Sequence, residues 1–226
     1  MSTTLHNPIS QDSIEQAVHI PAGEITLEGN FSFPAGAKGV VLFAHGSGSS
    51  RFSPRNRFVA QALNDTGLAT LLIDLLSPTE EAIDSRTGSL RFDIRLLAKR
   101  VVAAIDWLGQ NGQTRDIAVG CFGASTGAAA ALVAASERPA HVRAVVSRGG
   151  RPDLAGAALW EIEAPTLLIV GGEDTPVIAM NREAMEQLPG EKEMVIVPGA
   201  THLFEEPGAL EEVARLAAGW FERYLY

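Results

Sequence analysis

One pentapeptide in the sequence has the residue types and spacing of an activated serine. Ser125 lies between Gly123 and Gly127, after the apolar run 117–122 and before small residues that continue to about Glu137. This order of strand, turn and helix is that of a nucleophile elbow, in which a sharp turn lifts the serine above the edge of a sheet. Larger side chains two positions to either side would collide with the neighbouring backbone, so glycine is required there. The pattern predicts Ser125 as a nucleophile, against the alternative of an ordinary glycine-rich turn.

A serine nucleophile needs a base, and a histidine base needs a carboxylate that orients it. Among the five histidines of the chain, His202 is the one that follows the last predicted strand, so it is the candidate base. Asp174 follows two glycines and a glutamate at the end of another predicted strand and is the candidate acid, with Glu173 as the alternative. Thr175 precedes a proline and is expected to cap the next helix, which would leave Asp174 available to the histidine.

The oxyanion that forms during acyl transfer needs two backbone N–H donors. Thr126, directly after the nucleophile, is expected to supply one of them. The loop after an earlier strand should supply the other, and Ser47, between Gly46 and Gly48, is the candidate. His45 in the same loop is interpreted as a structural histidine that braces the loop by hydrogen bonds.

Arginine is enriched near the ends of the predicted strands, whereas the whole chain has only three lysines. Arg148 and Arg151 flank two glycines directly after a central strand. They are the candidate pair for binding a negatively charged substrate, because a guanidinium can hold a carboxylate or phosphate through two hydrogen bonds. The alternative is that these arginines pair with acids such as Asp153 and brace the loops.

Strands and helices alternate along most of the chain, which predicts an α/β fold. The expected strands, by residue number, are 17–20, 25–33, 40–44, 68–74, 117–122, 142–147, 166–170 and 194–197. We expect a mainly parallel sheet with helices on both faces and an antiparallel N-terminal hairpin. Residues 1–16 are interpreted as a polar lead-in and 17–226 as one domain. The segment 77–88 is expected to be a polar loop, the closing helix to span about 205–224, and the segment 147–165 to be too short for a cap domain.

Composition excludes several classes of function. The 226 residues carry a net charge of −9, which argues against nucleic acid or an anionic membrane as a partner. The single cysteine, Cys121, excludes an intrachain disulfide and is expected to be a core residue. The histidines are dispersed, so no metal site is predicted. The first residues lack the pattern of a secretory signal and no apolar stretch reaches transmembrane length, so a cytoplasmic protein is expected.

Four segments together resemble the α/β-hydrolases, specifically the dienelactone-hydrolase-like group. They are Phe43-Ala-His-Gly46, Gly123-Ala-Ser-Thr-Gly127, Gly171-Gly-Glu-Asp174 and Gly199-Ala-Thr-His202, and the similarity extends from about Ala17 to Leu225. The resemblance implies an α/β-hydrolase fold and a serine hydrolase that needs no cofactor. It further implies a carboxylic ester or lactone as the small-molecule substrate, with Ser125, Asp174 and His202 as the catalytic triad. Dienelactone hydrolases carry cysteine at the elbow, so their lactone specificity does not transfer. The resemblance also covers hydrolase-like domains fused to phosphoribosyltransferases.

Two other interpretations fit parts of the sequence. The segment Gly46-Ser-Gly-Ser-Ser-Arg51, with Asp74 after the next strand, is close to a dinucleotide-binding fingerprint and would suit a nicotinamide-dependent oxidoreductase. Arg51 replaces the third glycine, which weakens that interpretation. The second alternative is a catalytically silent hydrolase-fold module that only binds, because a fold alone does not prove activity.

Overall fold

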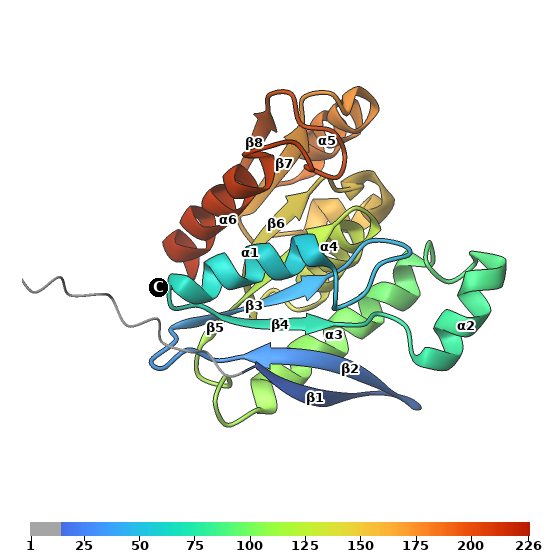
Figure 1. Ribbon diagram of the computed structural model, residues 1–226, viewed down its shortest axis with the longest axis vertical. Helices are drawn as coiled ribbons and strands as arrows, with labels where there is room; N and C mark the ends of the chain where they lie inside the picture. Colours follow the sequence, from blue (N-terminus) through green and yellow to red (C-terminus); the bar gives the residue numbers. More distant parts are fainter. Residues whose placement is uncertain (1–14) are drawn as a thin grey trace, which may run out of the picture.

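An eight-stranded sheet forms the centre of this computed structural model, which describes residues 15–226 (Figure 1). The strands are β1 (Glu15–Ala22), β2 (Ile25–Ser32), β3 (Gly39–Ala44), β4 (Ala69–Ile73), β5 (Ala118–Ala124), β6 (Val142–Arg148), β7 (Thr166–Gly171) and β8 (Lys192–Val197). Their order across the sheet is β1-β2-β4-β3-β5-β6-β7-β8. β1 and β2 pair antiparallel, as do β2 and β4, and every other pair is parallel. The predicted parallel sheet with an antiparallel N-terminal hairpin is therefore confirmed.

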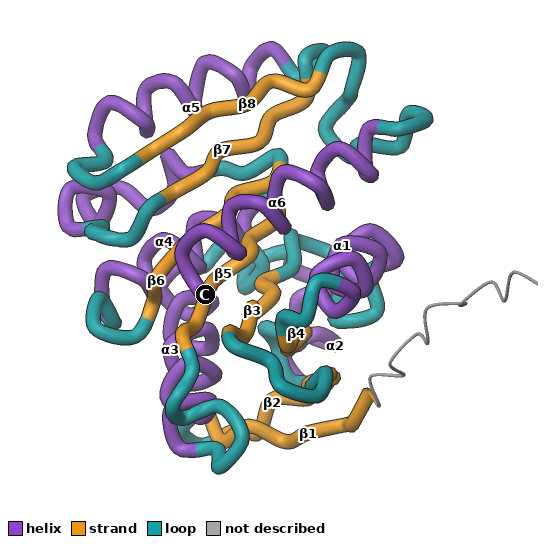
Figure 2. Tube along the Cα trace, turned by 90° about the vertical axis from the view of Figure 1, so that its left-hand side faces the viewer, coloured by secondary structure: helices purple, strands orange, loops and turns teal. Residues whose placement is uncertain are grey.

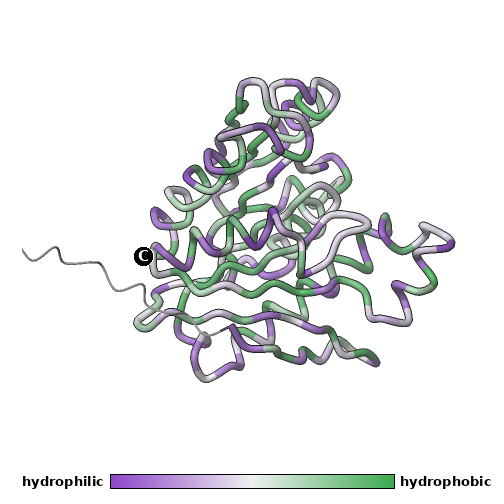
Figure 3. Tube along the Cα trace, viewed as in Figure 1, coloured by the Kyte–Doolittle hydropathy of each residue, from purple (hydrophilic) through white to green (hydrophobic). Residues whose placement is uncertain are grey.

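Helices cover both faces of the sheet (Figure 2). They are α1 (Pro54–Asp65), α2 (Pro78–Thr87), α3 (Ile94–Gln110), α4 (Thr126–Glu137), α5 (Thr175–Gln187) and α6 (Ala209–Leu225), with a 3-10 helix, η1 (Pro152–Glu161). α1 and α6 bury their apolar residues on one face, and α3, α4 and α5 bury theirs on the other. Figure 3 shows the hydrophobic segments concentrated in the strands and the hydrophilic ones in the outer turns.

The unbroken apolar run in β3 shows why this strand can lie at the centre. Leu42 and Ala44 pack in the core beneath α3 and α4, whereas Val41 and Phe43 pack in the core beneath α1 and α6. Because side chains alternate across a strand, a run that is apolar at every position fits a strand covered on both faces.

The segment after β4 differs from the prediction, because residues 78–87 form helix α2 and not a loop. Ser77 and Glu80 form a capping box, Pro78 occupies the first turn, and Gly88 ends the helix with φ 64°. These are standard start and stop signals of a helix. The only buried residue of α2 is Asp84, so the helix has no apolar stripe from which its period could be predicted.

Two helix starts also differ from the predictions. α5 begins at Thr175, so Asp174 and not Thr175 occupies the N-cap position. α6 begins at Ala209, four residues after the predicted start, because Gly208 takes φ 82° and Glu206 binds the preceding loop. These shifts leave the order of the elements unchanged.

The connection from β6 to β7 contains only η1, and the described residues 15–226 include no inserted cap domain. β1 begins at Glu15, two residues before the predicted start of the domain, and the rest of the predicted lead-in lies outside the described residues. Across residues 15–226, no helix combines the length and hydropathy that crossing a membrane requires.

Both ends of the described chain lie near the edge at which the parallel strands begin. Glu15 is opposite Ser32, which in turn is opposite Thr70 near the start of β4. At the other end, the Tyr226 hydroxyl donates to the Thr66 carbonyl, in the turn that leads into β4. The loops that carry the predicted catalytic residues lie at the opposite edge, where β3, β5, β6 and β7 end (Figure 1).

Candidate active site

Ser125 stands between β5 and α4 in the backbone conformation of a nucleophile elbow. Its φ and ψ are 50° and −121°, values that a non-glycine residue adopts only under strain. A Cβ at Gly123 would lie 2.3 Å from the Ala128 Cα atom, and one at Gly127 would lie 2.2 Å from the Ala44 carbonyl oxygen. Both glycines are therefore required by close approach of backbone, which is the physical reason predicted for them.

His202 and Asp174 meet at the same edge of the sheet. The distance from His202 Nδ1 to Asp174 Oδ2 is 2.6 Å, that of a short hydrogen bond. Asp174 occupies the N-cap position of α5 but makes no side-chain capping bond to that helix. Glu173 is exposed; its backbone N–H donates to the Ala200 carbonyl oxygen at 3.0 Å, and its carboxylate has no partner within residues 15–226. The geometry thus selects Asp174 over Glu173 as the carboxylate that can orient His202.

The end of β6 links the serine to the histidine. The Ser125 N–H donates to the Arg148 carbonyl oxygen at 3.3 Å. Next in the chain, Gly149 has φ 51°, and a Cβ there would lie 3.0 Å from the His202 carbonyl oxygen. Asn181 of α5, which is fully buried, donates to the Gly150 carbonyl oxygen at 3.0 Å and fixes the same turn. His202 is therefore packed against the segment that also holds the serine.

The loop that carries His202 has its own brace. Glu206 accepts hydrogen bonds from the Thr201 hydroxyl at 2.6 Å and the Thr201 N–H at 3.1 Å. The bond from the Thr201 hydroxyl is the main reason why the pKa of Glu206 is lowered. Phe204 is buried with φ 56°, a second strained residue beside the site. Sequence reasoning missed Glu206 and Asn181, since only the folded loops bring Thr201 and the Gly150 carbonyl oxygen within their reach.

The two predicted oxyanion residues line one small pocket at the end of β3. Ser47 and Thr126 both border it, and a Cβ at Gly46 would lie 3.0 Å from the Ser125 Cβ atom. A turn closed by the Ser49 N–H and the Gly46 carbonyl oxygen, at 3.2 Å, holds the loop in place. The N–H of Thr126 belongs to the first turn of α4, where backbone donors lack a partner within the helix. The loop and the helix start can therefore present two donors to one oxygen.

His45 braces this loop, as predicted. Its Nε2 accepts the Leu75 N–H at 3.0 Å, so Nδ1 carries the proton and donates to the Gly46 carbonyl oxygen at 2.9 Å. Burial lowers the pKa of His45 and favours this neutral form. Both ring nitrogens are engaged with backbone, so the structure gives His45 no catalytic geometry.

The arginines near the site fall into two groups. Arg151 binds Asp153 through two hydrogen bonds of 2.9 and 2.7 Å, which is the bracing alternative. Arg148 is 6% exposed and has no acidic partner among the described residues. One of its Nη atoms donates to Asn56 at 3.2 Å, and its Nε has no partner within residues 15–226. Burial, with Arg55 nearby, lowers the pKa of Arg148 to about 10.

The segment that resembles a dinucleotide fingerprint has a structural explanation. Asp74, the acid of that pattern, accepts hydrogen bonds from the backbone and the guanidinium of Arg51. Glu28 accepts a further bond from the same guanidinium at 2.6 Å. Asp74 thus holds the arginine that replaces the third glycine, and this pair fixes the loop between β3 and α1.

Neither the cysteine nor a cluster of metal ligands forms a further reactive site within the described residues. Cys121 is fully buried, and burial raises the pKa of its thiol to about 12. Within residues 15–226, no group of three or more His, Cys, Asp or Glu side chains could hold a metal ion.

Comparisons with known proteins agree with this fold. The sequence profile of the dienelactone hydrolase family matches residues 28–226. A crystal structure of a dienelactone hydrolase from Anabaena variabilis is 64% identical, with a TM-score of 0.93, and the match covers 95% of this chain and 99% of that one. Est1E from Butyrivibrio proteoclasticus shares the fold, with a TM-score of 0.76 at 15% identity over 92% of this chain and 98% of its own.

Two curated proteins from strains of Mycobacterium tuberculosis, each named "Putative phosphoribosyl transferase", are 53% identical to this chain over 211 residues. The match covers 93% of the chain but 47% of each relative, so the chain spans about half the length of these relatives. The family profile and the structural matches support a hydrolase of the α/β-hydrolase fold. The chain belongs to the dienelactone hydrolase family.

Proposed function

We propose that this chain is a serine hydrolase that cleaves small carboxylic esters or lactones through an acyl-enzyme at Ser125. The observation that carries the proposal is the 2.6 Å hydrogen bond between His202 and Asp174, at the edge where the strained Ser125 stands. A base held by a carboxylate beside a serine on an elbow is the arrangement that acyl transfer needs.

In the proposed reaction, Ser125 Oγ attacks the ester carbonyl while His202 Nε2 takes its proton. Asp174 accepts the Nδ1 hydrogen bond, which fixes the tautomer and stabilises the imidazolium. The N–H groups of Ser47 and Thr126 stabilise the oxyanion. His202 then protonates the leaving alcohol, and water activated by the same base releases the acid. Within the described residues no hydrogen bond joins Ser125 to His202, and such contacts commonly tighten only when substrate binds.

Replacement of the nucleophile tests this proposal. Ser125→Ala should abolish turnover of p-nitrophenyl acetate, because no other residue can form the acyl-enzyme. The variant should keep the wild-type circular dichroism spectrum and melting temperature. Fluorophosphonate labelling followed by peptide mapping should place the adduct on Ser125 in the wild type alone. Turnover retained in Ser125→Ala would contradict the assignment, and a wild-type protein that binds esters without turnover would favour the catalytically silent module.

The name of the longer relatives introduces transfer of a phosphoribosyl group as another activity. The hydrolase profile already occupies residues 28–226, and the curated relatives extend to about twice the length of this chain. We therefore assign hydrolysis to the region that this chain covers, and assign any phosphoribosyl transfer by those relatives to their remaining half.

We further propose that the substrate bears a negative charge, here placed on the leaving group because Arg148 ends the strand before Gly149, which lies beside His202. Of the two predicted residues, Arg151 is engaged with Asp153, so the proposal now rests mainly on Arg148. The Nε of its buried guanidinium has no partner among the described residues, and the next residue, Gly149, lies close to the His202 backbone. Burial of a charge without an opposite charge is costly, and a substrate carboxylate would offset that cost.

The matched substrates for this test are 4-acetoxybenzoate and its neutral methyl ester. Arg148→Met should lower kcat/KM for the charged ester by about tenfold relative to the neutral one, since an ionic hydrogen bond is lost. Arg151→Met is the comparison, with a smaller expected change in this ratio. Equal losses for both esters in Arg148→Met, or a variant that does not fold, would give Arg148 a structural role.

A further inference from the structure

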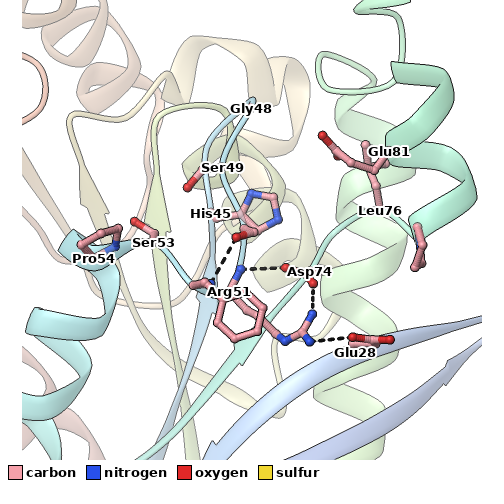
Figure 4. Close-up of a pocket in the computed structure, with 13 residues that line it drawn as sticks. Glu28, His45, Gly48, Ser49, Arg51, Ser53, Pro54, Asp74, Leu76 and Glu81 are labelled. Carbon is pink, nitrogen blue, oxygen red and sulfur yellow. Dashed lines mark hydrogen bonds and ion pairs between the residues drawn. The ribbon is translucent and has the colours of Figure 1, made fainter. Parts of the chain in front are cut away.

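A cavity of about 450 Å³ lies between the loop after β3 and helix α2, beside the oxyanion residues (Figure 4). Its walls come from that loop and the start of α1, from Glu28 in the middle of β2, from the residues after β4 and from the start of α2. Figure 4 shows Glu81 projecting from α2 and Asp74 lying across from it beside Arg51. The catalytic steps described above use no side chain of this cavity.

The cavity shares part of its wall with the oxyanion pocket. His45, Gly48, Ser49, Leu76 and Glu81 line both spaces, and the smaller pocket reaches Ser47 and Thr126. A group bonded to the reacting carbonyl carbon could therefore extend from the oxyanion donors into the cavity beneath α2.

The position of His202 decides which part of the substrate lies there. His202 packs against Gly149 after β6, on one side of β5, whereas the cavity lies beyond β3 and β4 on the other side. The leaving oxygen must lie next to His202, because the histidine protonates it. In the tetrahedral intermediate the acyl chain and the leaving oxygen are different substituents of the acyl carbon, so with the leaving oxygen beside the histidine the acyl chain can extend on the other side, where the cavity lies.

The inner end of this path has a polar atom that lacks a partner. Thr126 is 2% exposed, and its Oγ1 has no hydrogen-bond partner within the described residues. A buried hydroxyl without a partner is costly, and native structures nearly always satisfy such groups. Thr126 borders this pocket of about 10 Å³, and a hydroxyl on an acyl chain that widens the pocket on binding would supply the missing bond.

The outer end is acidic. Glu28, Asp74 and Glu81 line the cavity with one cation, Arg51, which binds the first two. Glu81 makes no ion pair with any residue that the structure describes. Carboxylates accept hydrogen bonds and repel other carboxylates. This end therefore favours hydroxyl donors and disfavours an anionic acyl chain.

We propose that the cavity is the acyl subsite and that it selects short, uncharged acyl chains bearing a hydroxyl group. The inference rests on the serine hydrolase proposed above and specifies which acids that enzyme releases. It complements the proposed role of Arg148, which concerns a charge on the leaving group at the other side of β5.

The first test compares methyl 3-hydroxybutanoate with methyl 3-methylbutanoate, in which a methyl group replaces the hydroxyl. The wild type should prefer the hydroxy ester in kcat/KM by about fivefold or more, the value of one buried hydrogen bond. Thr126→Val keeps the backbone N–H but loses the hydroxyl, so this preference should disappear. Thr126→Ser should restore it. A preference that is absent from the wild type, or unchanged in Thr126→Val, would overturn the proposal.

The second test uses monomethyl succinate, whose acyl chain carries a carboxylate, with methyl pentanoate as the neutral reference. Glu81→Gln should raise the ratio of their kcat/KM values by about two- to threefold at low salt, because one exposed repulsive charge is removed. Glu186→Gln removes an exposed charge on α5 and should leave the ratio unchanged. A ratio that does not rise in Glu81→Gln would argue against an acidic acyl subsite.

These outcomes are separable from failure of the proposed function. Fluorophosphonate labelling of Ser125 and turnover of p-nitrophenyl acetate report on the nucleophile alone. If the protein is labelled at Ser125 and active but shows none of the expected selectivities, the proposed function stands and the proposed acyl subsite is wrong. If turnover does not depend on Ser125, both proposals are wrong.

Discussion

Asp174 and Glu173 are adjacent carboxylates with different surroundings. Asp174 reaches His202 at 2.6 Å, whereas Glu173 is exposed to solvent. Asp174→Asn should lower kcat for p-nitrophenyl acetate by about 10³- to 10⁴-fold, because the amide favours the wrong histidine tautomer. Glu173→Gln is the matched control, with an expected change of less than about twofold. Steady-state kinetics on both variants checks this, and a larger loss in Glu173→Gln would move the acid to that residue.

At the residue scale, the sequence predicts a residue's role best when the contacts that require it lie within one local turn. The elbow glycines could be predicted, since any Cβ there strikes backbone within the same local turn. The braces from Asn181 and Glu206 could not be predicted, because the position of their partners, the Gly150 carbonyl oxygen and Thr201, depends on how the loops fold. The arginines were ambiguous for the same reason, and only the fold shows that Asp153 neutralises Arg151.

At the scale of elements, apolar runs identified the central strands because both faces of the sheet are covered. α2 was missed because its one buried residue is Asp84, so no apolar period exists. The capping box of Ser77 and Glu80, with Gly88 after the helix, was the available signal. Exposed helices of this kind are better predicted from their ends than from their faces.

The cap of α2 gives a prediction at this scale. Ser77→Ala removes the side chain that accepts the Glu80 N–H, and should destabilise the helix start by about 1 kcal/mol. Hydrogen exchange of residues 78–87 should become faster, because α2 opens locally more often. Ser85→Ala, in the exposed interior of the same helix, should not make the exchange faster, because alanine favours the helix. Equal exchange in the Ser77→Ala variant and the wild type would show that packing and not capping holds α2.

At the scale of the whole molecule, the connection between β6 and β7 is too short to form a lid over the candidate site. The connection contains only the 3-10 helix η1, and α2 lines one side of the proposed acyl subsite. We expect kcat/KM to decrease from p-nitrophenyl butanoate to the dodecanoate, since a long chain would leave the cavity. The rate should also show no jump when the substrate forms micelles. Rates that rise with chain length through long acyl groups would contradict this expectation.

The placement of the two chain ends has a consequence for multidomain architecture. Tyr226 lies beside the turn before β4, and Glu15 lies near the start of the same strand, at the edge remote from Ser125. A second domain tethered after Tyr226 would therefore stand behind the sheet, with the predicted catalytic loops facing the other way. Such a domain would not cover the candidate site.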